Sequence, residues 1–528
     1  GGGGGGGSAT APPPGTASPP GAGDSHPPPG AWAEWVEHAR ALKLAEAECA
    51  GLAAEMAGAA AAEDYARAAE LREAVRALEG RDALARVREE LAGAVEREDF
   101  GAAAALRDAS GGPLEGWWVG KGLEGDPVGH LLHVEAGFGR WVGTACTARD
   151  LAAQQSLEPP PLKGAAGTVR SLEEAVASPD ELLDLPPPGG WEVGPARVME
   201  VLVRDQPPGG ARAPPGAGAG PAGGLELQAV TLHPDSTALV SGLGAEPEDP
   251  AFAVASDNLI DSMMGAPMEL EAAALEWSPG SGGGGRDEFV LTTRSCDERD
   301  AQMMQDVSQQ VVFSDKAGGD VAWPTRSIPD NVAESIRDLV STSQEMHPQL
   351  AGATRYQRLD LDLPSTDPFT GYFVGNFGKH GPELLRLRRE WQRLSADGDG
   401  LDAEAPLEEV VVAEKVTGDR NVPAGTVSFR ARVGRQHRLD SSMYPDDLMI
   451  TGRYKGEGRV AKADYQEPKW VEGDLLVFNK RADPLMMGAE LGFVWSVPGR
   501  RRYLILLNRV DLASLKLDDG APPPAGPA

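Results

Sequence analysis

The stretch DPFTGYFVGNFGKHGPELLRLRREW, residues 367–391, decides how the last third of this 528-residue chain folds. It contains two short apolar runs, at 371–375 and 383–387, separated by glycines and a proline, which is typical of two strands joined by a turn. Similar runs continue at 409–415, 426–433, 449–454, 474–478, 492–497 and 503–507. Eight closely spaced antiparallel strands usually close into a barrel, because closure removes the exposed strand edges. The sequence therefore predicts a closed barrel of about eight strands within residues 366–512.

A second β-rich region lies upstream, at 111–242, and carries a Pro/Gly-rich insertion at 207–224. Short apolar runs predict strands at 116–120, 130–134, 141–143, 196–203 and 225–232. The octapeptide PLEGWWVG, residues 113–120, has the same pattern as PFTGYFVG, residues 368–375. An internal duplication explains this match, and chance recurrence of a Gly-aromatic-aromatic-Val-Gly motif explains it equally well.

The N-terminal segment 31–110 has the composition of helices, because Ala, Leu, Glu and Arg dominate it. The unit EDYARAAELRE, residues 63–73, recurs 35 residues later as EDFGAAAALRD, residues 98–108. Each copy has an acidic residue that caps a helix start, then an aromatic residue, small residues and a Leu-Arg pair. We expect two antiparallel helical hairpins in which the aromatic residue and the leucine supply the buried contact. A single long coiled coil is the alternative, and the 35-residue period counts against it.

The remaining segments are too rich in Gly, Pro or acidic residues to bury a core. Residues 1–30 and 513–528 are predicted to be disordered ends, and 243–365 an acidic, partly disordered linker with a short helix at 331–342. The predicted fold class is therefore α+β and multidomain. N-terminal helical hairpins precede two antiparallel β-rich domains, of which the last is the closed barrel.

The net charge of −31 argues against a nucleic-acid partner, because phosphate binding requires a dense cationic surface. The segment 366–512 itself is neutral, with 22 Lys/Arg and 22 Asp/Glu. A local basic patch around 386–393 and 500–502 is one interpretation, and solvated charge at strand ends is the favoured one. Three cysteines are too few for a disulfide framework, and no run of about 18 apolar residues predicts a membrane span.

No catalytic constellation is recognisable, so we do not expect an enzyme, a cofactor or a bound metal ion. His130 and His133 are three residues apart on a predicted strand and would face opposite sides of it. The DGDG sequence at 397–400 resembles the start of a calcium loop but lacks the closing glutamate.

Two features of the C-terminal segment are candidate functional features instead. The turn TGDRNVPAG, residues 417–425, combines residue types suited to a constrained backbone, and its candidate barrel-mouth residues are Gly418, Asp419, Asn421 and Pro423. Trp470 lies just before a predicted strand, between charged residues, and we expect it to be half exposed. Trp495 alternates within a strand and is expected in the core.

These motifs resemble the C-terminal domain of the EXECUTER family of chloroplast proteins. The motifs that carry the resemblance are DPF at 367–369, GYFVG at 371–375, KVTGDRNVPAG at 415–425, YKGEGRVA at 454–461, WVEGDLLV at 470–477 and GAELGF at 488–493. The helical repeats are similar to the UVR motif, which that family also carries, and 116–151 resembles its Gly-Trp-Trp segment. The same C-terminal fold is similar to the substrate-binding barrel of an F-box protein that binds cyclin D1.

The resemblance implies a chloroplast protein on the thylakoid membrane that senses singlet oxygen and starts signalling from plastid to nucleus. It also implies partners: a thylakoid FtsH protease, photosystem II or the chlorophyll-synthesis machinery, and a paralogue in a hetero-oligomer. Attachment to the membrane would be peripheral. No transit peptide is visible in the sequence, which opens on Gly1.

Members of the family are tagged by oxidation of one tryptophan and then degraded, and its place in the domain corresponds to Trp470. The indole adds singlet oxygen across its pyrrole double bond and opens, which needs access rather than a catalyst. A packing residue at a strand end is the alternative for Trp470.

UVR-like hairpins also dock on partner proteins, including Clp-type chaperones. The alternative function is therefore an adaptor that delivers clients to a chloroplast Clp-type protease. The candidate partner-binding residues in the two helical repeats are Tyr65, Arg72, Phe100 and Arg107.

Overall fold

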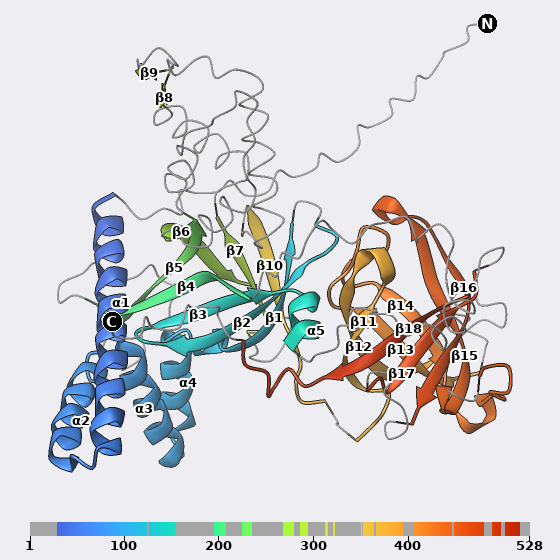
Figure 1. Cartoon of the computed structure of the whole chain (residues 1–528), viewed down its shortest axis with the longest axis horizontal. Helices are drawn as coiled ribbons and strands as arrows, with labels where there is room; N and C mark the ends of the chain where they lie inside the picture. Colours follow the sequence, from blue (N-terminus) through green and yellow to red (C-terminus); the bar gives the residue numbers. More distant parts are fainter. Residues whose placement is uncertain are drawn as a thin grey trace, which may run out of the picture.

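The computed structural model consists of a helical N-terminal part and two closed β-barrels, which lie side by side (Figure 1). It describes residues 29–123, 126–154, 195–206, 224–234, 268–278, 286–293, 312–314, 320–322, 350, 352–363, 366–393, 406–445, 448–479, 488–497 and 502–517. The predicted helix at 331–342 lies outside the described residues. So does the DGDG sequence at 397–400.

The N-terminal part forms two helical hairpins, as predicted. Its helices are α1 (Pro29–Ala61), α2 (Tyr65–Glu79), α3 (Ala83–Glu96) and α4 (Phe100–Ala109). The two repeat units begin alike: the Asp64 carboxylate accepts the backbone N–H of Arg67, and the Asp99 carboxylate accepts that of Ala102. These N-caps stabilise the start of α2 and of α4, so the 35-residue repeat corresponds to one structural unit.

The expectation that both the aromatic residue and the leucine of each unit are buried was half wrong. Leu71 and Leu106 are buried, but Tyr65 and Phe100 are 70% and 69% exposed. Six residues separate each aromatic ring from its leucine, which places the two side chains about 120° apart around the helix. The leucine faces the partner helix, and the aromatic ring therefore cannot.

The first barrel has eight strands in the order β1-β10-β7-β6-β5-β4-β3-β2. Their bounds are β1 (Gly116–Gly122), β2 (His130–Gly137), β3 (Arg140–Cys146), β4 (Ala196–Asp205), β5 (Leu225–Pro234), β6 (Met268–Trp277), β7 (Glu288–Thr292) and β10 (Ala353–Arg358). A short pair, β8 (Val312–Ser314) and β9 (Asp320–Ala322), and a helix, α5 (Ala148–Gln154), complete this half of the chain.

The predicted domain boundary at 242/243 is therefore wrong, because β6, β7 and β10 of the predicted linker complete this barrel. Alternation alone could not reveal them. The sequence of β6, MELEAAALEW, consists mostly of good helix formers, and only its pairing with β5 and β7 makes it a strand.

The second barrel confirms the eight predicted strands. They are β11 (Gly371–Asn376), β12 (Pro382–Gln392), β13 (Glu408–Lys415), β14 (Val427–Arg432), β15 (Ile450–Lys462), β16 (Gln466–Phe478), β17 (Leu491–Trp495) and β18 (Tyr503–Val510), and they close in sequence order. Trp495 is 1% exposed and lies in the core, as expected. β15 and β16 are longer than predicted, so Trp470 lies within β16 rather than before a strand.

The two barrels have the same strand register, which favours an internal duplication over chance. Trp118 pairs with Leu132 in the first barrel, and Phe373 pairs with Leu385 in the second. The bulge between Gly143 and Thr144 in β3 has its counterpart between Ala413 and Glu414 in β13. The pairings from β1 through β10 match those from β11 through β18 around the whole circumference, so the residues paired in both barrels can be assigned equivalents.

In each barrel, an arginine on the last strand also binds the segment that precedes the first strand; we call it the closing arginine. Arg358 lies 4.2 Å from the ring centroid of Trp118 and donates to the carbonyl oxygens of Glu115 and Pro113. Arg509 lies 4.6 Å from the ring centroid of Phe373 and donates to the carbonyl oxygens of Thr370 and Pro368 at the equivalent positions.

The barrels contact each other through an apolar cluster and a pair of loops. The cluster joins Trp117 and Leu151 of the first half to Tyr372 and Leu512 of the second. Leu515 and Leu517 pack against it, so residues 513–517 are ordered and the predicted disordered tail began too early.

Candidate functional site

Trp470 is held between two arginine side chains on the outer face of the second barrel. The guanidinium carbon of Arg430 on β14 lies 4.4 Å from its ring centroid, and that of Arg459 on β15 lies 4.3 Å away. Arg459 is the direct cross-strand partner of Trp470. A guanidinium within about 6 Å of an indole face is attracted by the ring quadrupole. The half-buried ring expected from the sequence is therefore observed, but arginines bury it rather than the barrel core.

Further polar contacts fix both arginines. Arg430 Nε donates to Glu457 Oε1 at 2.6 Å, and Arg430 is only 7% exposed. Arg459 donates to the hydroxyl oxygen of Tyr465. Because Arg430 is a charged residue and nearly buried, the ring that covers it contributes to the stability of this face.

The same outer face of the first barrel is covered in another way. By register, Leu270 is the equivalent of Trp470, Leu232 of Arg459, and Glu200 of Arg430. Helix α1 packs on this face, and its Trp35, Ala39 and Leu42 form an apolar cluster with Leu202 and Val230. Figure 1 shows α1 lying against the first barrel, while β14, β15 and β16 lie in the other barrel, away from α1.

The hairpin that carries Trp470 ends in a strained tip. Asp464, Tyr465 and Glu467 have φ angles of 59°, 53° and 48°, in the left-handed region that L-residues other than Gly, Asn and Asp rarely adopt. Arg420 of the turn 417–425 pairs with Asp464 at 2.8 Å, and Lys462 pairs with Glu467 at 2.6 Å. These ion pairs are well exposed, so each contributes little.

The predicted barrel-mouth turn lies at the end of the second barrel that faces the first. Gly418 N–H donates to the carbonyl oxygen of Val128 at 2.8 Å, and Ala424 N–H donates to that of Pro127 at 2.8 Å. A Cβ atom at Gly418 would lie 2.1 Å from the Ala424 nitrogen, which explains the glycine. The turn therefore joins the two barrels, and it does not border an open mouth on this side.

Asp419 organises the turn from inside. Its Oδ1 accepts the backbone N–H groups of Asn421 at 2.5 Å and Val422 at 2.8 Å. Its Oδ2 lies 2.5 Å from the Lys415 ammonium, which also contacts Glu383. Lys415 and Glu383 are 1% and 2% exposed, so one buried cation serves two carboxylates. Pro423 contributes its carbonyl oxygen to the N–H of Thr426 at 3.2 Å.

The two carboxylates of this buried triad differ in proton affinity. Burial raises the pKa of Glu383 to about 8, although the Lys415 ammonium acts in the opposite direction. Burial also opposes ionisation of Asp419, but Lys415 and the hydrogen bonds outweigh it and lower its pKa to about 2. Asp419 thus carries the negative charge, and Glu383 holds a proton up to neutral pH.

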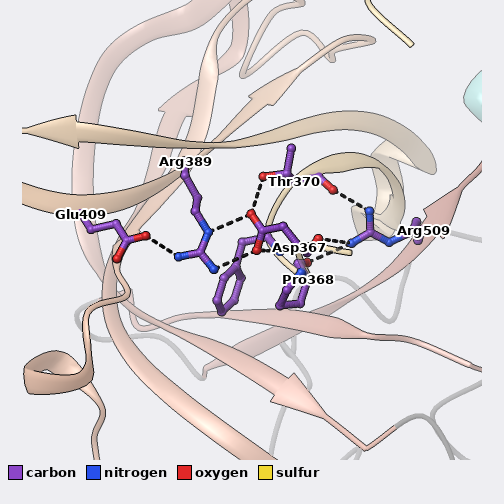
Figure 2. A network of polar contacts seen from close by, with 7 residues as sticks. Asp367, Pro368, Thr370, Arg389, Glu409 and Arg509 are labelled. Carbon is purple, nitrogen blue, oxygen red and sulfur yellow. Dashed lines mark hydrogen bonds and ion pairs between the residues drawn. The ribbon is translucent and has the colours of Figure 1, made fainter. Parts of the chain in front are cut away.

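Arg386, Arg388 and Arg389, which suggested a basic patch, are paired with acids, whereas residues 500 and 501 lie outside the described residues. Arg389 donates to both carboxylate oxygens of Asp367 at 2.8 Å and also contacts Glu409, as Figure 2 shows. In the same view Arg509 donates to the backbone of Thr370 at 2.5 Å. Arg386 and Arg388 pair with Asp360, Glu390 and Glu414. Solvated, neutralised charge is therefore the correct interpretation for these positions.

The candidate partner-binding residues of the helices lie on the surface. The side chain of Arg72 is 58% exposed, and that of Arg107 is 48% exposed and pairs with the neighbouring Asp108. Together with the exposed rings of Tyr65 and Phe100, each repeat unit presents one aromatic and one basic side chain to solvent.

No group of three or more His, Cys, Asp or Glu side chains among the described residues could hold a metal ion. His130 bonds the Tyr356 hydroxyl through Nε2 at 2.9 Å, and His133 stacks on Trp117. In the same part of the chain, no helix is long and apolar enough to cross a membrane.

Sequence reasoning missed Arg430 and Arg459. Both lie in ordinary alternating strands, and they reach Trp470 only through the pairing of β14, β15 and β16. The signal available in the sequence was the alternation of charged residues along 453–459, which predicts a solvated outer face.

Known proteins share parts of this sequence. Residues 356–514, which contain the second barrel, match the family described as the cyclin D1 binding domain. Protein EXECUTER 2, chloroplastic, of Oryza sativa subsp. japonica is 34% identical over 233 residues, which is 44% of this chain and 36% of that protein. The Arabidopsis thaliana protein of the same name is 32% identical over 243 residues, 43% of this chain and 37% of that protein. Protein EXECUTER 1, chloroplastic, of Arabidopsis thaliana is 33% identical over 187 residues, 34% of this chain and 26% of that protein.

These similarities support membership of the EXECUTER family. The chain matches little more than a third of the length of the two EXECUTER 2 proteins and 26% of the length of the EXECUTER 1 protein. Because the relatives are named as chloroplastic, they also support a chloroplast location for this EXECUTER-like chain.

Proposed function

We propose that this EXECUTER-like protein senses singlet oxygen in the chloroplast and signals from plastid to nucleus. The trigger is oxidation of Trp470, followed by degradation of the protein by an FtsH-type protease of the thylakoid. The protein would associate peripherally with the thylakoid membrane, near photosystem II or the chlorophyll-synthesis machinery where singlet oxygen forms. A paralogue is a further proposed partner.

The observation that carries this proposal is the position of the Trp470 ring between Arg430 and Arg459. Singlet oxygen opens the pyrrole ring of an indole, so the product no longer offers the same π face to the two guanidinium groups. Oxidation of this ring therefore disturbs a packed surface. The two neighbouring tryptophans of the second barrel differ in this respect.

Those two tryptophans provide the comparison. Trp391 on β12 is 67% exposed, so it is accessible to singlet oxygen, but its oxidation disturbs little packing. Trp495 is 1% exposed and is protected. A sensor needs a residue that is both reachable and part of the structure, and among the three tryptophans on the described strands of the second barrel Trp470 combines these properties.

The test is a comparison of Trp470→Phe with Trp391→Phe in chloroplasts exposed to a photosensitiser and strong light. Phenylalanine keeps an aromatic face but is not opened by singlet oxygen. We expect light-induced loss of the protein to stop in Trp470→Phe and to continue in Trp391→Phe. Equal turnover of both variants and the unaltered protein would rule out Trp470 as the trigger.

A second candidate function is a client adaptor for a Clp-type protease, and the exposed rings of Tyr65 and Phe100 favour it. Two equivalent rings on two equivalent hairpins form a repeated contact surface. The double variant Tyr65→Ala/Phe100→Ala should lose binding to a purified Clp chaperone, while Leu44→Ala, exposed on α1, should keep it. If the double variant binds as the unaltered protein does, these rings are not the docking surface.

A further inference from the structure

Two arginine side chains lie over the reactive ring in the second barrel. Arg430 and Arg459 lie 4.4 Å and 4.3 Å from the centroid of Trp470, and each comes from a different strand. Singlet oxygen is an electrophile and adds to the C2–C3 bond through a face of the indole. The two cations withdraw electron density from that bond, and their side chains obstruct the approach.

The tip of the same hairpin depends on this stack. Tyr465 and Glu467 are in the left-handed region, which is strained for both residue types. The ion pairs that hold the tip are well exposed and weak. Further contacts restrain it: the backbone N–H of Tyr465 donates to the carbonyl oxygen of Arg420 at 3.2 Å, and Arg459 contacts both Tyr465 and Trp470. The contacts of Arg459 connect the tip to the packed part of β16.

We propose that Arg430 and Arg459 act as a clamp on Trp470. The clamp slows the addition of singlet oxygen to the ring, and loss of the ring releases the hairpin tip, residues 460–469. The slower addition of singlet oxygen deepens the proposed function and rests on it. The release of the tip concerns the fold alone and holds in the dark.

The reaction itself needs only singlet oxygen as co-reactant. One O₂ adds across C2 and C3 of the Trp470 indole, and the resulting dioxetane breaks its O–O bond and the C2–C3 bond. The two carbon atoms become carbonyl carbons, of which one is a formamide and the other a ketone. All atoms of O₂ remain in the product, which is N-formylkynurenine, and no proton or leaving group departs. The remaining benzene ring is smaller than the indole and bears an electron-withdrawing ketone, so it attracts a guanidinium less strongly.

The effect of the clamp on reactivity is measured with Arg459→Gln and a matched control, Lys455→Gln. Lys455 lies on the same strand and the same face, pairs with Glu472 and is 58% exposed. The folded full-length variants are illuminated with a photosensitiser, and peptide mass spectrometry follows the addition of two oxygen atoms to Trp470 relative to Trp391 in the same molecule. We expect this ratio to rise about threefold or more in Arg459→Gln, since removal of one cation–π contact makes the ring more reactive. An unchanged ratio in Arg459→Gln, or an equal rise in Lys455→Gln, would overturn the clamp.

Release of the tip is measured by hydrogen exchange in the dark on peptides that cover 459–472. Trp470→Ala should exchange faster than the unaltered protein in these peptides, while exchange in β11 and β12 stays the same. Trp470→Phe keeps a π face between the arginines and should stay close to the unaltered protein. Unchanged exchange of the tip in Trp470→Ala would contradict the release, and faster exchange throughout the barrel would show that the whole domain is destabilised instead.

The two sets of results separate the clamp from the sensor. If the hairpin opens in Trp470→Ala but light-induced turnover does not depend on Trp470, the release stands and the proposed function fails. If turnover depends on Trp470 but the hairpin stays closed in Trp470→Ala, the sensor stands and the release fails. Degradation of Trp470→Ala in darkness would support both, because an opened hairpin is then sufficient for the protease.

Discussion

The two barrels of this chain share their strand order, their register and their closing arginine, but they protect the same outer face differently. In the first barrel Leu202, Val230 and Leu270 form an apolar face, and helix α1 covers it. In the second, the equivalents of Val230 and Leu270 are Glu457 and Trp470, and the face is polar enough to be exposed to solvent. A duplicated fold can thus keep its register while one copy binds a helix on this face and the other presents a polar face with a half-buried tryptophan.

Loss of the helical cover should have the largest effect on this comparison. Trp35 is 5% exposed, packs on the first barrel and lies 3.9 Å from the guanidinium of Arg204. We expect Trp35→Ala to lower the free energy of unfolding by about 3–5 kcal/mol, because a buried tryptophan and its cation–π contact are removed together. Urea denaturation monitors the change. Leu44→Ala on the same helix, 72% exposed, should change it by less than about 0.5 kcal/mol.

The closing arginines should respond in parallel if the duplication is real. Arg509 holds the carbonyl oxygens of Thr370 and Pro368 and pairs with Glu490 at 3.3 Å. We expect Arg509→Ala to cost about 3 kcal/mol, because several charge-assisted hydrogen bonds are lost and carbonyl groups are left unpaired. Arg358→Ala in the first barrel should cost a comparable amount. A large effect in one barrel and none in the other would show that the equivalent arginines do not stabilise both barrels in the same way.

The interiors of the two barrels differ in which positions carry the large side chains, and Gly458 provides a test of this difference. A Cβ atom at Gly458 would lie 2.1 Å from Trp495 Nε1, whereas the register equivalents of Gly458 and Trp495 in the first barrel are Thr231 and Thr293. We expect Gly458→Ala to destabilise the protein by roughly 1–3 kcal/mol through overpacking. Thermal unfolding measures it, and Gly458→Ala/Trp495→Val should recover part of the loss. Tolerance of Gly458→Ala alone would mean that Trp495 can move.

The sequence predicted these elements unevenly, for physical reasons. Alternation of apolar residues identified a part of every strand of the second barrel, because its apolar runs are separated by turn residues. It failed for β6, where alanine and glutamate are strand residues only because β5 and β7 lie beside them. Trp470 could be selected as a candidate from its motif, but the arginines that hold it required the pairing of three strands. This site consists of contacts between distant segments, and the local sequence pattern does not predict such contacts.

The last comparison concerns pH, and here the two barrels should respond in opposite directions. Glu383 and His130 occupy equivalent positions, opposite Gly375 and Gly120. Glu383 contacts Lys415 and lies near Asp419 and His380, and burial raises its pKa to about 8. His130 lies beside Tyr356 and near Asp126, and burial lowers its pKa to about 4. For Glu383 the folded state binds the proton more tightly than the unfolded state does. Its contribution to stability is therefore complete below about pH 4.5 and is lost as the pH rises towards 8, at up to about 1.4 kcal/mol per pH unit.

For His130 the sign is reversed, because the folded state binds the proton less tightly. Its contribution is present above about pH 6.5 and is lost as the pH falls towards 4. Glu383→Gln should remove the decline between pH 5 and pH 8 in urea-unfolding free energies, and His130→Gln should remove part of the decline below pH 6.5. Glu472→Gln, whose side chain is 79% exposed, is the matched control and should keep both declines. If Glu383→Gln retains the full decline towards pH 8, the buried triad does not hold a proton, and the two equivalent positions do not oppose each other in this pH range.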